Sequence, residues 1–155
     1  MEGEALASGS YHADNVAPVL MGGFTLVRSI KPIDVIKLPY PSELRAIVLH
    51  PKIELRTMHA REILKDKVSL EKAISQWGNL AAFISALYTK DFDLMSRSLI
   101  DEIVEPVRSL LIPEFETIKK AVIKEGALGF GISGSGPSVY ALAKGSKNGN
   151  RIAYK

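Results

Sequence analysis

Cysteine is absent from the 155 residues of the sequence. Disulfides, zinc–thiolate sites, iron–sulfur clusters and thiol catalysis are therefore excluded, and the composition suits a reducing compartment, for which the cytoplasm is the default. No run of residues approaches the roughly 18 consecutive apolar residues of a membrane span. The amino end, Met1-Glu2-Gly3-Glu4, is acidic where a secretory signal is basic. We therefore expect a soluble protein of the cytoplasm.

Acidic residues are also missing from the last twelve positions, which contain Lys144, Lys147, Arg151 and Lys155. Subtracting these four charges from the net charge of +3 leaves −1 for residues 1–143. A nearly neutral body lacks the basic stripe of a nucleic-acid-binding protein, so nucleic acid is not an expected partner. The contents of 46% hydrophobic and 24% charged residues are those of an ordinary globular chain.

The hydrophobic pattern places strands at both ends of a helical middle. Strands are predicted near residues 24–27, 45–50 and 138–143, and helices near 57–64, 69–88, 91–103 and 113–126. In the long helix, three- and four-residue spacing predicts an inward-facing stripe of Leu70, Ile74, Trp77, Leu80, Ala81, Ile84, Leu87 and Tyr88. The order predicts an α+β fold of the ferredoxin-like split βαβ type, with an antiparallel sheet and helices on one face.

The sequence pattern at both ends of the chain is typical of a truncated domain. Residues 1–8 have the pattern of a helix end, and the tail has turn residues where a further helix is expected, so no helix is predicted there. We assign 1–29 to the remnant of an amino-terminal domain, 30–145 to a carboxy-terminal domain and 146–155 to a basic tail. A domain without its packing partner exposes an apolar face, which predicts self-association or poor solubility.

Four glycines fall within eight residues in the segment Gly129-Phe-Gly-Ile-Ser-Gly-Ser-Gly-Pro. Such a loop can bring backbone N–H groups close to an anion, as phosphate-binding nests do. It matches neither of the common nucleotide-binding glycine motifs, because a strand and not a helix follows Pro137. The alternative interpretation is a plain hairpin, in which glycines are needed because the backbone of the turn requires positive φ.

Polar side chains gather in a second segment, Tyr11-His12-Ala13-Asp14-Asn15, in which His12 lies eight residues after Glu4. A bend at Gly9-Ser10 would bring the two parts to one pocket, where a carboxylate such as Glu4 could hold Mg²⁺. The alternative is that Asp14 and Asn15 cap a short helix while His12 satisfies a hydrogen bond in the core.

Two arginines, Arg61 and Arg108, are candidates for a planar two-bond contact with a carboxylate, although each taken singly is more typical of a solvated surface arginine. His50 and His59 have no partner at metal-ligand spacing and are interpreted as structural. The serines at 133, 135 and 138 lack the context of a hydrolase triad.

In this order, the segments resemble those of the homoserine kinases, members of the GHMP small-molecule kinase superfamily. The matching stretches are Glu4 to Pro18 with Gly22-Gly23-Phe24, Thr57 to Arg61, Asp101 to Arg108 with Leu111-Ile112-Pro113, and Gly131 to Pro137. Four motifs in the family's order are far more specific than any one of them.

The resemblance implies transfer of the ATP γ-phosphoryl group to the hydroxyl of L-homoserine, a step of threonine biosynthesis, by a protein that is a homodimer at full length. It further implies that Glu4 binds Mg²⁺, that His12 and Asp14 line the homoserine pocket, and that Arg61 and Arg108 hold the homoserine carboxylate. Asn15 stands where several relatives have an aspartate base and would orient the hydroxyl. The residues Gly131, Ser133, Gly134, Ser135 and Gly136 would back the nucleotide phosphates.

One departure from the family bears on activity. The Gly-Leu-Gly-Ser-Ser-Ala loop that wraps the triphosphate in the family does not occur upstream of Glu4. We therefore expect the acceptor half of a homoserine kinase that is inactive alone. A non-catalytic ferredoxin-like module that dimerises or binds an amino acid is the alternative.

Overall fold

The computed structural model describes residues 13–53 and 63–154. By its internal contacts the chain separates into two compact units, Met1–Pro41 and Ser42–Lys155. The end of the expected amino-terminal remnant, at residue 29, falls within a strand of the first unit. None of the helices in the described ranges combines the length and the apolarity that crossing a bilayer requires.

The first unit contains a short helix and a hairpin. Helix α2 (Val16–Met21) is followed by strands β1 (Phe24–Ile30) and β2 (Ile33–Leu38), which pair antiparallel with an irregularity between Val27 and Ser29. The pattern did not predict β2, because the prolines around it suggested an irregular segment. Pro32 and Pro41 lie outside the paired residues, where the missing N–H costs the ladder nothing.

The second unit is built on an antiparallel sheet in the order β3-β5-β4. Its strands are β3 (Leu44–Leu49), β4 (Gly129–Ile132) and β5 (Val139–Lys144), and Leu49 faces Val139 in the register. Between β3 and β4 lie α4 (Leu70–Thr89), α5 (Phe92–Ser98), α6 (Glu105–Arg108), the 3₁₀ turn η1 (Ser109–Leu111) and α7 (Phe115–Lys124). This arrangement confirms the predicted α+β class with antiparallel pairing.

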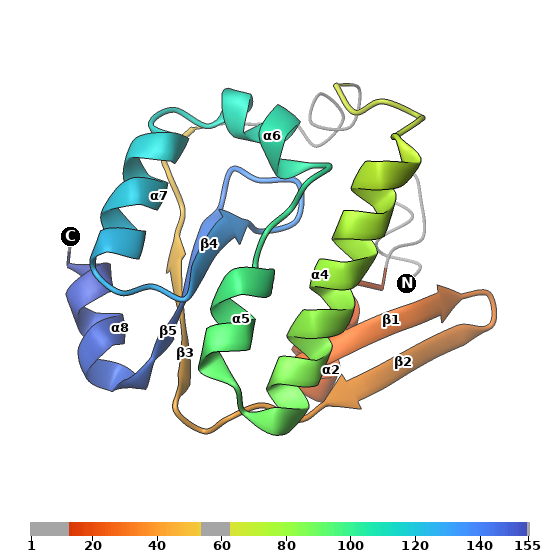
Figure 1. Cartoon of the computed structure of the whole chain (residues 1–155), viewed down its shortest axis with the longest axis horizontal. Coiled ribbons are helices and arrows are strands. Elements are labelled where there is room, and N and C mark those ends of the chain that lie inside the picture. Colours follow the sequence, from red (N-terminus) through yellow and green to blue (C-terminus); the bar gives the residue numbers. More distant parts are fainter. Residues whose placement is uncertain (1–12, 54–62, 155) are drawn as a thin grey trace. The chain divides into compact units, whose positions relative to one another are not determined.

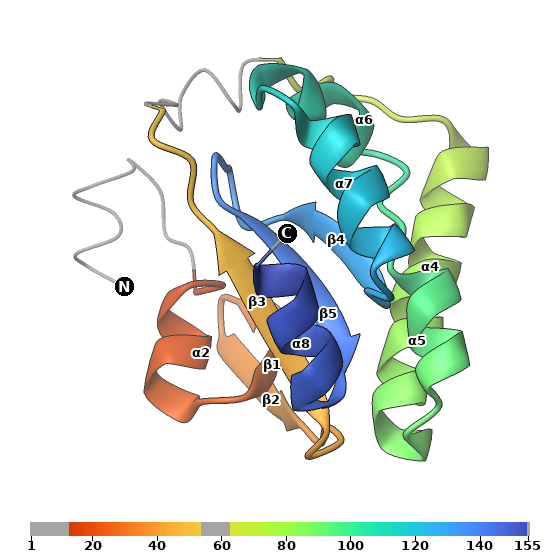
Figure 2. The same cartoon turned by 90° about the vertical axis from the view of Figure 1, so that its left-hand side faces the viewer.

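The hydrophobic core of the second unit lies between the sheet and helices α7 and α8 (Gly145–Ala153), which cover one face of it (Figure 2). Alternate residues of β5 point into this core, as the two-residue period of a strand requires. The rings of Phe115 and Phe130 pack there with centroids 5.1 Å apart. The core consists of Ile112, Phe115, Val122, Ala127, Phe130, Val139, Ala141, Ala143 and Ile152.

Helix α8 corrects the expectation that the tail forms no helix. Its sequence is rich in glycine and asparagine, so intrinsic propensity is low, and packing stabilises it. Ile152 is buried in the core, and Arg151 forms an ion pair with Glu125 and donates to its backbone carbonyl at the end of α7. These contacts join residues far apart in sequence, which a local pattern does not reveal.

The segment predicted as a helix over 91–103 is interrupted earlier than expected. Helix α5 begins after Asp91, whose Oδ1 accepts the N–H of Leu94 at 2.9 Å, and ends at Ser98. Glu105-Pro106 lies outside the predicted helices and opens the short helix α6. Proline is tolerated in a first turn because the N–H groups there have no partner within the helix.

Helix α4 lies outermost in the second unit, beside α5 (Figure 1). Ser69 caps it at the predicted start of the helix and accepts the N–H of Lys72 at 3.3 Å. The predicted inward stripe was wrong. Of its members only Leu87 is fully buried, while Leu70, Ile74, Trp77, Leu80 and Tyr88 are exposed. The opposite side of the helix, with Phe83 and Ala86, is also apolar and packs inward instead.

Candidate functional site

The glycine-rich segment forms the turn between β4 and β5, residues 133–138, which we call the glycine turn. The N–H of Ser133 donates to the carbonyl of Ser138 at 2.8 Å, and the N–H of Gly136 donates to the carbonyl of Ser133 at 3.1 Å. Gly134 has φ of +61°, a conformation that favours glycine. The hairpin interpretation therefore describes the backbone, while phosphate binding by this turn stays a prediction.

Glycines of the strand before the turn are needed for close packing. A Cβ placed on Gly129 would lie 2.5 Å from the Cβ of Leu99, far inside van der Waals contact. A Cβ on Gly131 would meet the phenol oxygen of Tyr140 at 3.1 Å. Two of the glycines in this segment, Gly129 and Gly131, are therefore explained by how closely β4 approaches Leu99 and Tyr140.

Arg108 lies next to the glycine turn. Its Nη1 donates to the carbonyl of Gly134 at 3.1 Å, across 26 positions of sequence. Arg108 belongs to the last turn of α6, and the residue as a whole is half-buried. The structure therefore brings together two features that the sequence analysis singled out separately, an arginine able to grip a carboxylate and the glycine-rich turn.

Two acidic residues of the same segment hold α6 in place. Asp101 Oδ1 accepts the N–H groups of Ile103 at 2.9 Å and Val104 at 2.7 Å, which fixes the turn that leads into the helix. Glu105 forms an ion pair with Lys119 of α7. Because Arg108 follows Glu105 by about one helical turn, these contacts set the position from which Arg108 reaches the glycine turn.

A cross-strand bond closes the base of the glycine turn. His50 Nδ1 and Ser138 Oγ lie 2.7 Å apart, directly beyond the last register pair of β3 and β5. This contact agrees with the structural interpretation of His50. The sequence analysis treated the two residues separately, and no local signal connects positions 88 residues apart.

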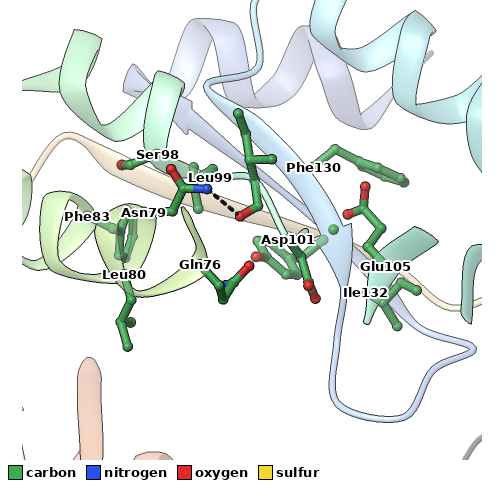
Figure 3. Close-up of a pocket in the computed structure, with 13 residues that line it drawn as sticks. Gln76, Asn79, Leu80, Phe83, Ser98, Leu99, Asp101, Glu105, Phe130 and Ile132 are labelled. Atoms are coloured by element: carbon green, nitrogen blue, oxygen red, sulfur yellow. Dashed lines mark hydrogen bonds between the residues drawn. The ribbon is translucent and has the colours of Figure 1, made fainter. Parts of the chain in front are cut away.

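A pocket of about 250 Å³ lies beside β4, between α4 and the segment 98–105 (Figure 3). Asn79 and Leu80 of α4 lie on one side, and Glu105 and Ile132 lie on the other. Gln76 Oε1 accepts the N–H of Glu102 at 2.8 Å, and Asn79 Nδ2 donates to the carbonyl of Ile100 at 3.3 Å. The sequence analysis missed both amides, because it predicted the opposite side of α4 to face inward.

Tyr140 of β5 also lines this pocket. Burial raises the pKa of its phenol above 10.0, and the negative charges of Glu105 and Asp101 raise that pKa further. The phenol therefore stays neutral at ordinary pH. The volume of about 250 Å³ is below the roughly 300–1,000 Å³ of typical ligand pockets.

The other predicted site residues are only partly covered by the structure. Glu4, His12 and Arg61 lie outside the described residues. Asp14 and Asn15 are exposed at the start of α2, and the Asn15 side chain makes no capping hydrogen bond, although that residue occupies the cap position. Within residues 13–53 and 63–154, no group of three His, Asp or Glu side chains is arranged to hold a metal ion.

Comparison with known families adds to this geometry. Residues 83–155, which include α5 to α8, the glycine turn and Arg108, match the family model described as GHMP kinases C terminal. Residues 83–155 form a GHMP kinase C-terminal domain. The family resemblance inferred from the motifs is therefore confirmed.

Relatives extend the match over nearly the whole chain. It is 47% identical to a homoserine kinase of Chlorobium phaeobacteroides over 98% of this chain and 48% of the relative. A homoserine kinase of Pyrococcus abyssi is 38% identical over 96% of this chain and 50% of the relative. The chain thus spans about half the length of the curated relatives it matches.

Solved structures agree with the fold. The crystal structure of a homoserine kinase from Cytophaga hutchinsonii superposes with a TM-score of 0.95 at 52% identity, covering 98% of this chain and 48% of that one. A putative homoserine kinase from Listeria monocytogenes gives a TM-score of 0.68 at 23% identity over 96% of this chain and 48% of that one, which supports the fold alone. The likeness to solved structures therefore covers nearly the whole chain and extends beyond the matched residues 83–155.

Proposed function

We propose that this chain supplies the acceptor-binding half of a homoserine kinase. The reaction breaks the bond between the γ-phosphorus of ATP and its bridging oxygen and joins that phosphorus to the side-chain oxygen of L-homoserine. The products are ADP and O-phospho-L-homoserine, an intermediate on the way to threonine. The observation that carries the proposal is the contact between Arg108 and the glycine turn, within a chain 47% identical to a homoserine kinase.

The proposed role of Arg108 is to bind the homoserine carboxylate, together with Arg61. A guanidinium presents parallel N–H groups whose spacing matches the two oxygens of a carboxylate. The bond to Gly134 and the anchoring of α6 by Asp101 and Glu105 hold the guanidinium in one place. A fixed guanidinium favours catalysis because phosphoryl transfer depends largely on positioning and charge neutralisation.

The proposed roles at the other end of the substrate belong to His12, Asp14 and Asn15. His12 and Asp14 would line the homoserine pocket, and Asn15 would orient the attacking hydroxyl. The amide of Asn15 is not used to cap α2, which supports this role. An amide cannot take up a proton at neutral pH, so the hydroxyl proton would pass late in the reaction to a phosphoryl oxygen.

ATP and Mg²⁺ are the proposed cofactors. Gly131, Ser133, Gly134, Ser135 and Gly136 would back the nucleotide phosphates. The amides of Ser133 and Gly136 close the turn itself, so this segment is a weak phosphate site alone. Glu4 is the proposed Mg²⁺ ligand and lies outside the described residues. We expect the chain alone to be inactive.

The test is a coupled ADP-release assay with L-homoserine, ATP and Mg²⁺. It compares the chain alone with a mixture of the chain and the remaining half of the Cytophaga hutchinsonii relative. We expect activity only in the mixture. Arg108→Ala should lower kcat/KM for homoserine by about 10- to 100-fold, the usual cost of losing hydrogen bonds to a charged group. Arg97→Ala, which removes an exposed arginine from α5, is the matched control.

The possible outcomes separate the hypotheses. Equal rates for Arg108→Ala and Arg97→Ala would contradict the role of Arg108. A mixture that assembles by light scattering but releases no ADP would overturn the kinase proposal. Homoserine binding by calorimetry without ADP release would instead support a module that only binds an amino acid.

A further inference from the structure

The pocket of about 250 Å³ beside β4 has both polar and apolar walls (Figure 3). We call it the β4 pocket. Apart from Gly131, no described residue that lines it belongs to the proposed catalytic and binding set. Cavities that stay dry in proteins are apolar, whereas polar cavities take up water or a ligand. The polar part of the lining therefore indicates a polar occupant.

Two carboxylates, those of Asp101 and Glu105, line the β4 pocket. Glu105 forms an ion pair with Lys119, and its side chain is only 12% exposed. Asp101 Oδ1 accepts two backbone N–H groups, but Asp101 has no ion-pair partner within residues 13–53 and 63–154. No basic side chain of those ranges lines the pocket. One negative charge therefore stays uncompensated, and in a half-buried site it favours a cationic ligand.

Tyr140 adds a polar group close to the carboxylates. The negative charges of Glu105 and Asp101 both raise the pKa of its phenol, which places the hydroxyl near the two acids. In the part of the chain that the structure describes, this hydroxyl has no hydrogen-bond partner. A neutral phenol oxygen can accept a hydrogen bond, so the β4 pocket offers a cation three oxygen-bearing groups.

Apolar side chains form the opposite end of the β4 pocket. Figure 3 shows Phe83 and Leu80 of α4 on the side away from the two carboxylates. The amides of Gln76 and Asn79 already bond to the backbone of the segment 98–105, which holds α4 beside that segment. A ligand that matches both ends has a positive charge at one end and a short apolar chain at the other.

An organic cation suits these groups better than a metal ion. Divalent cations in proteins take most of their ligands from carboxylates and other oxygens arranged around one point. Within the described ranges, no three His, Asp or Glu side chains are placed to hold such an ion. A primary ammonium group needs only three acceptors, because it carries three N–H donors.

We propose that the β4 pocket binds a small primary ammonium ion that carries a short apolar chain. The ammonium group donates to Asp101, Glu105 and the hydroxyl of Tyr140, and the chain lies against Phe83. The volume of about 250 Å³ restricts the ligand to a few non-hydrogen atoms beyond the ammonium group. The proposal is independent of the kinase reaction, because binding requires neither ATP nor the other half of a relative.

Titration calorimetry of the full chain with n-butylammonium chloride tests the proposal. We expect a dissociation constant in the millimolar range, because so small a ligand gains little binding free energy. n-Butanol has the same chain without the charge and should bind at least about 10-fold more weakly, since hydrogen bonds to charged groups are stronger. Ammonium chloride lacks the chain and should also bind more weakly. Equal binding of n-butanol, or no binding of n-butylammonium in the millimolar range, overturns the proposal.

Substitutions in the β4 pocket test the same assignment. Asp101→Asn keeps an acceptor oxygen for the N–H groups of Ile103 and Val104 but removes the charge, so n-butylammonium should bind about 10-fold more weakly or worse. Asp93→Asn, at an exposed position in the first turn of α5, is the matched control and should bind like the unchanged chain. Tyr140→Phe should weaken binding a few-fold. Equal binding by Asp101→Asn and Asp93→Asn overturns the proposal, and circular dichroism checks that each variant folds.

The location of the ligand is tested separately. Binding that is lost in Asp14→Asn but kept in Asp101→Asn would place n-butylammonium in the proposed homoserine pocket and overturn the β4 pocket. In nuclear magnetic resonance spectra we expect the amide signals of Leu99 and Ile132 to shift with the ligand, while that of Ala153, which does not line the pocket, stays in place. A chain that binds n-butylammonium in this way, in a mixture that releases no ADP, would uphold this proposal and overturn only the kinase proposal.

Discussion

Helices α4 and α7 carry similar apolar patterns but use them differently. In α7 the apolar residues Phe115, Ile118 and Val122 pack in the core beside the sheet. In α4 the predicted residues form an exposed stripe, and the other side packs inward. The distribution of polar residues around the two helices explains the difference, because α7 has one apolar side whereas α4 has two. Periodicity identifies apolar faces, but it does not say which neighbour covers each face.

The largest effect should come from the buried side of α7. Phe115→Ala removes a ring that is 2% exposed and packs on Phe130, so we expect a loss of about 3–5 kcal/mol in the free energy of unfolding. Urea unfolding followed by circular dichroism measures this loss. Trp77→Ala, at a concentration where the chain is monomeric, should cost less than about 1 kcal/mol. Similar losses for both variants would mean that the exposed apolar side of α4 is buried in the folded chain.

A second comparison uses one residue type on the two sides of α4. Leu87→Ala leaves a cavity at a fully buried position and should cost about 2–5 kcal/mol. Leu70→Ala, at an exposed position, should change the unfolding free energy of the monomer by about 0.5 kcal/mol or less. A larger loss of stability for Leu70→Ala than for Leu87→Ala would mean that the side of α4 with Leu70 is buried in the core, as the periodicity alone predicts.

Much of the fold follows from local patterns. The Ser69 cap, the start of α4 and the strands around residues 45–50 and 138–143 were predictable because their signals lie within a few residues. Helix α8 was not, because its stability comes from the distant contacts of Ile152 and Arg151. Strand β2 was missed because the prolines beside it lie outside its paired residues.

The candidate site was likewise predictable from the sequence only in part. The motif order identified Arg108 and the glycine turn from sequence, through a resemblance to a family. Their contact across 26 positions, and the bond between His50 and Ser138, depend on the tertiary fold. Glu4, His12 and Arg61 stay predictions, because they lie outside the described residues.

The ends of the two helices differ as well, which gives a smaller test. Ser69 caps α4 with its side chain, whereas α7 begins at Glu114 without a side-chain cap. Ser69→Ala should therefore destabilise the chain by about 1 kcal/mol. Ser75→Ala, in the exposed middle of α4, is the matched control and should be neutral or slightly stabilising because alanine favours the helix. Equal effects of the two changes would show that the cap contributes nothing.

The smallest effect concerns Tyr140, which lines the pocket beside the inward side of α4. Burial raises the pKa of its phenol above 10.0, so at high pH the folded chain holds a proton that the unfolded chain has released. This contribution to stability is complete below pH 10.0 and is lost as the pH rises through the raised pKa.

Tyr140→Phe should therefore lose less stability in alkali than the unchanged chain. Tyr154→Phe, at an exposed position, should follow the unchanged chain, and urea unfolding on both sides of pH 10.0 measures the difference. If the free energy of unfolding fell equally with pH in all three chains, α4 would leave Tyr140 open to water. The inward side of α4 would then cover the sheet less closely than α7 does.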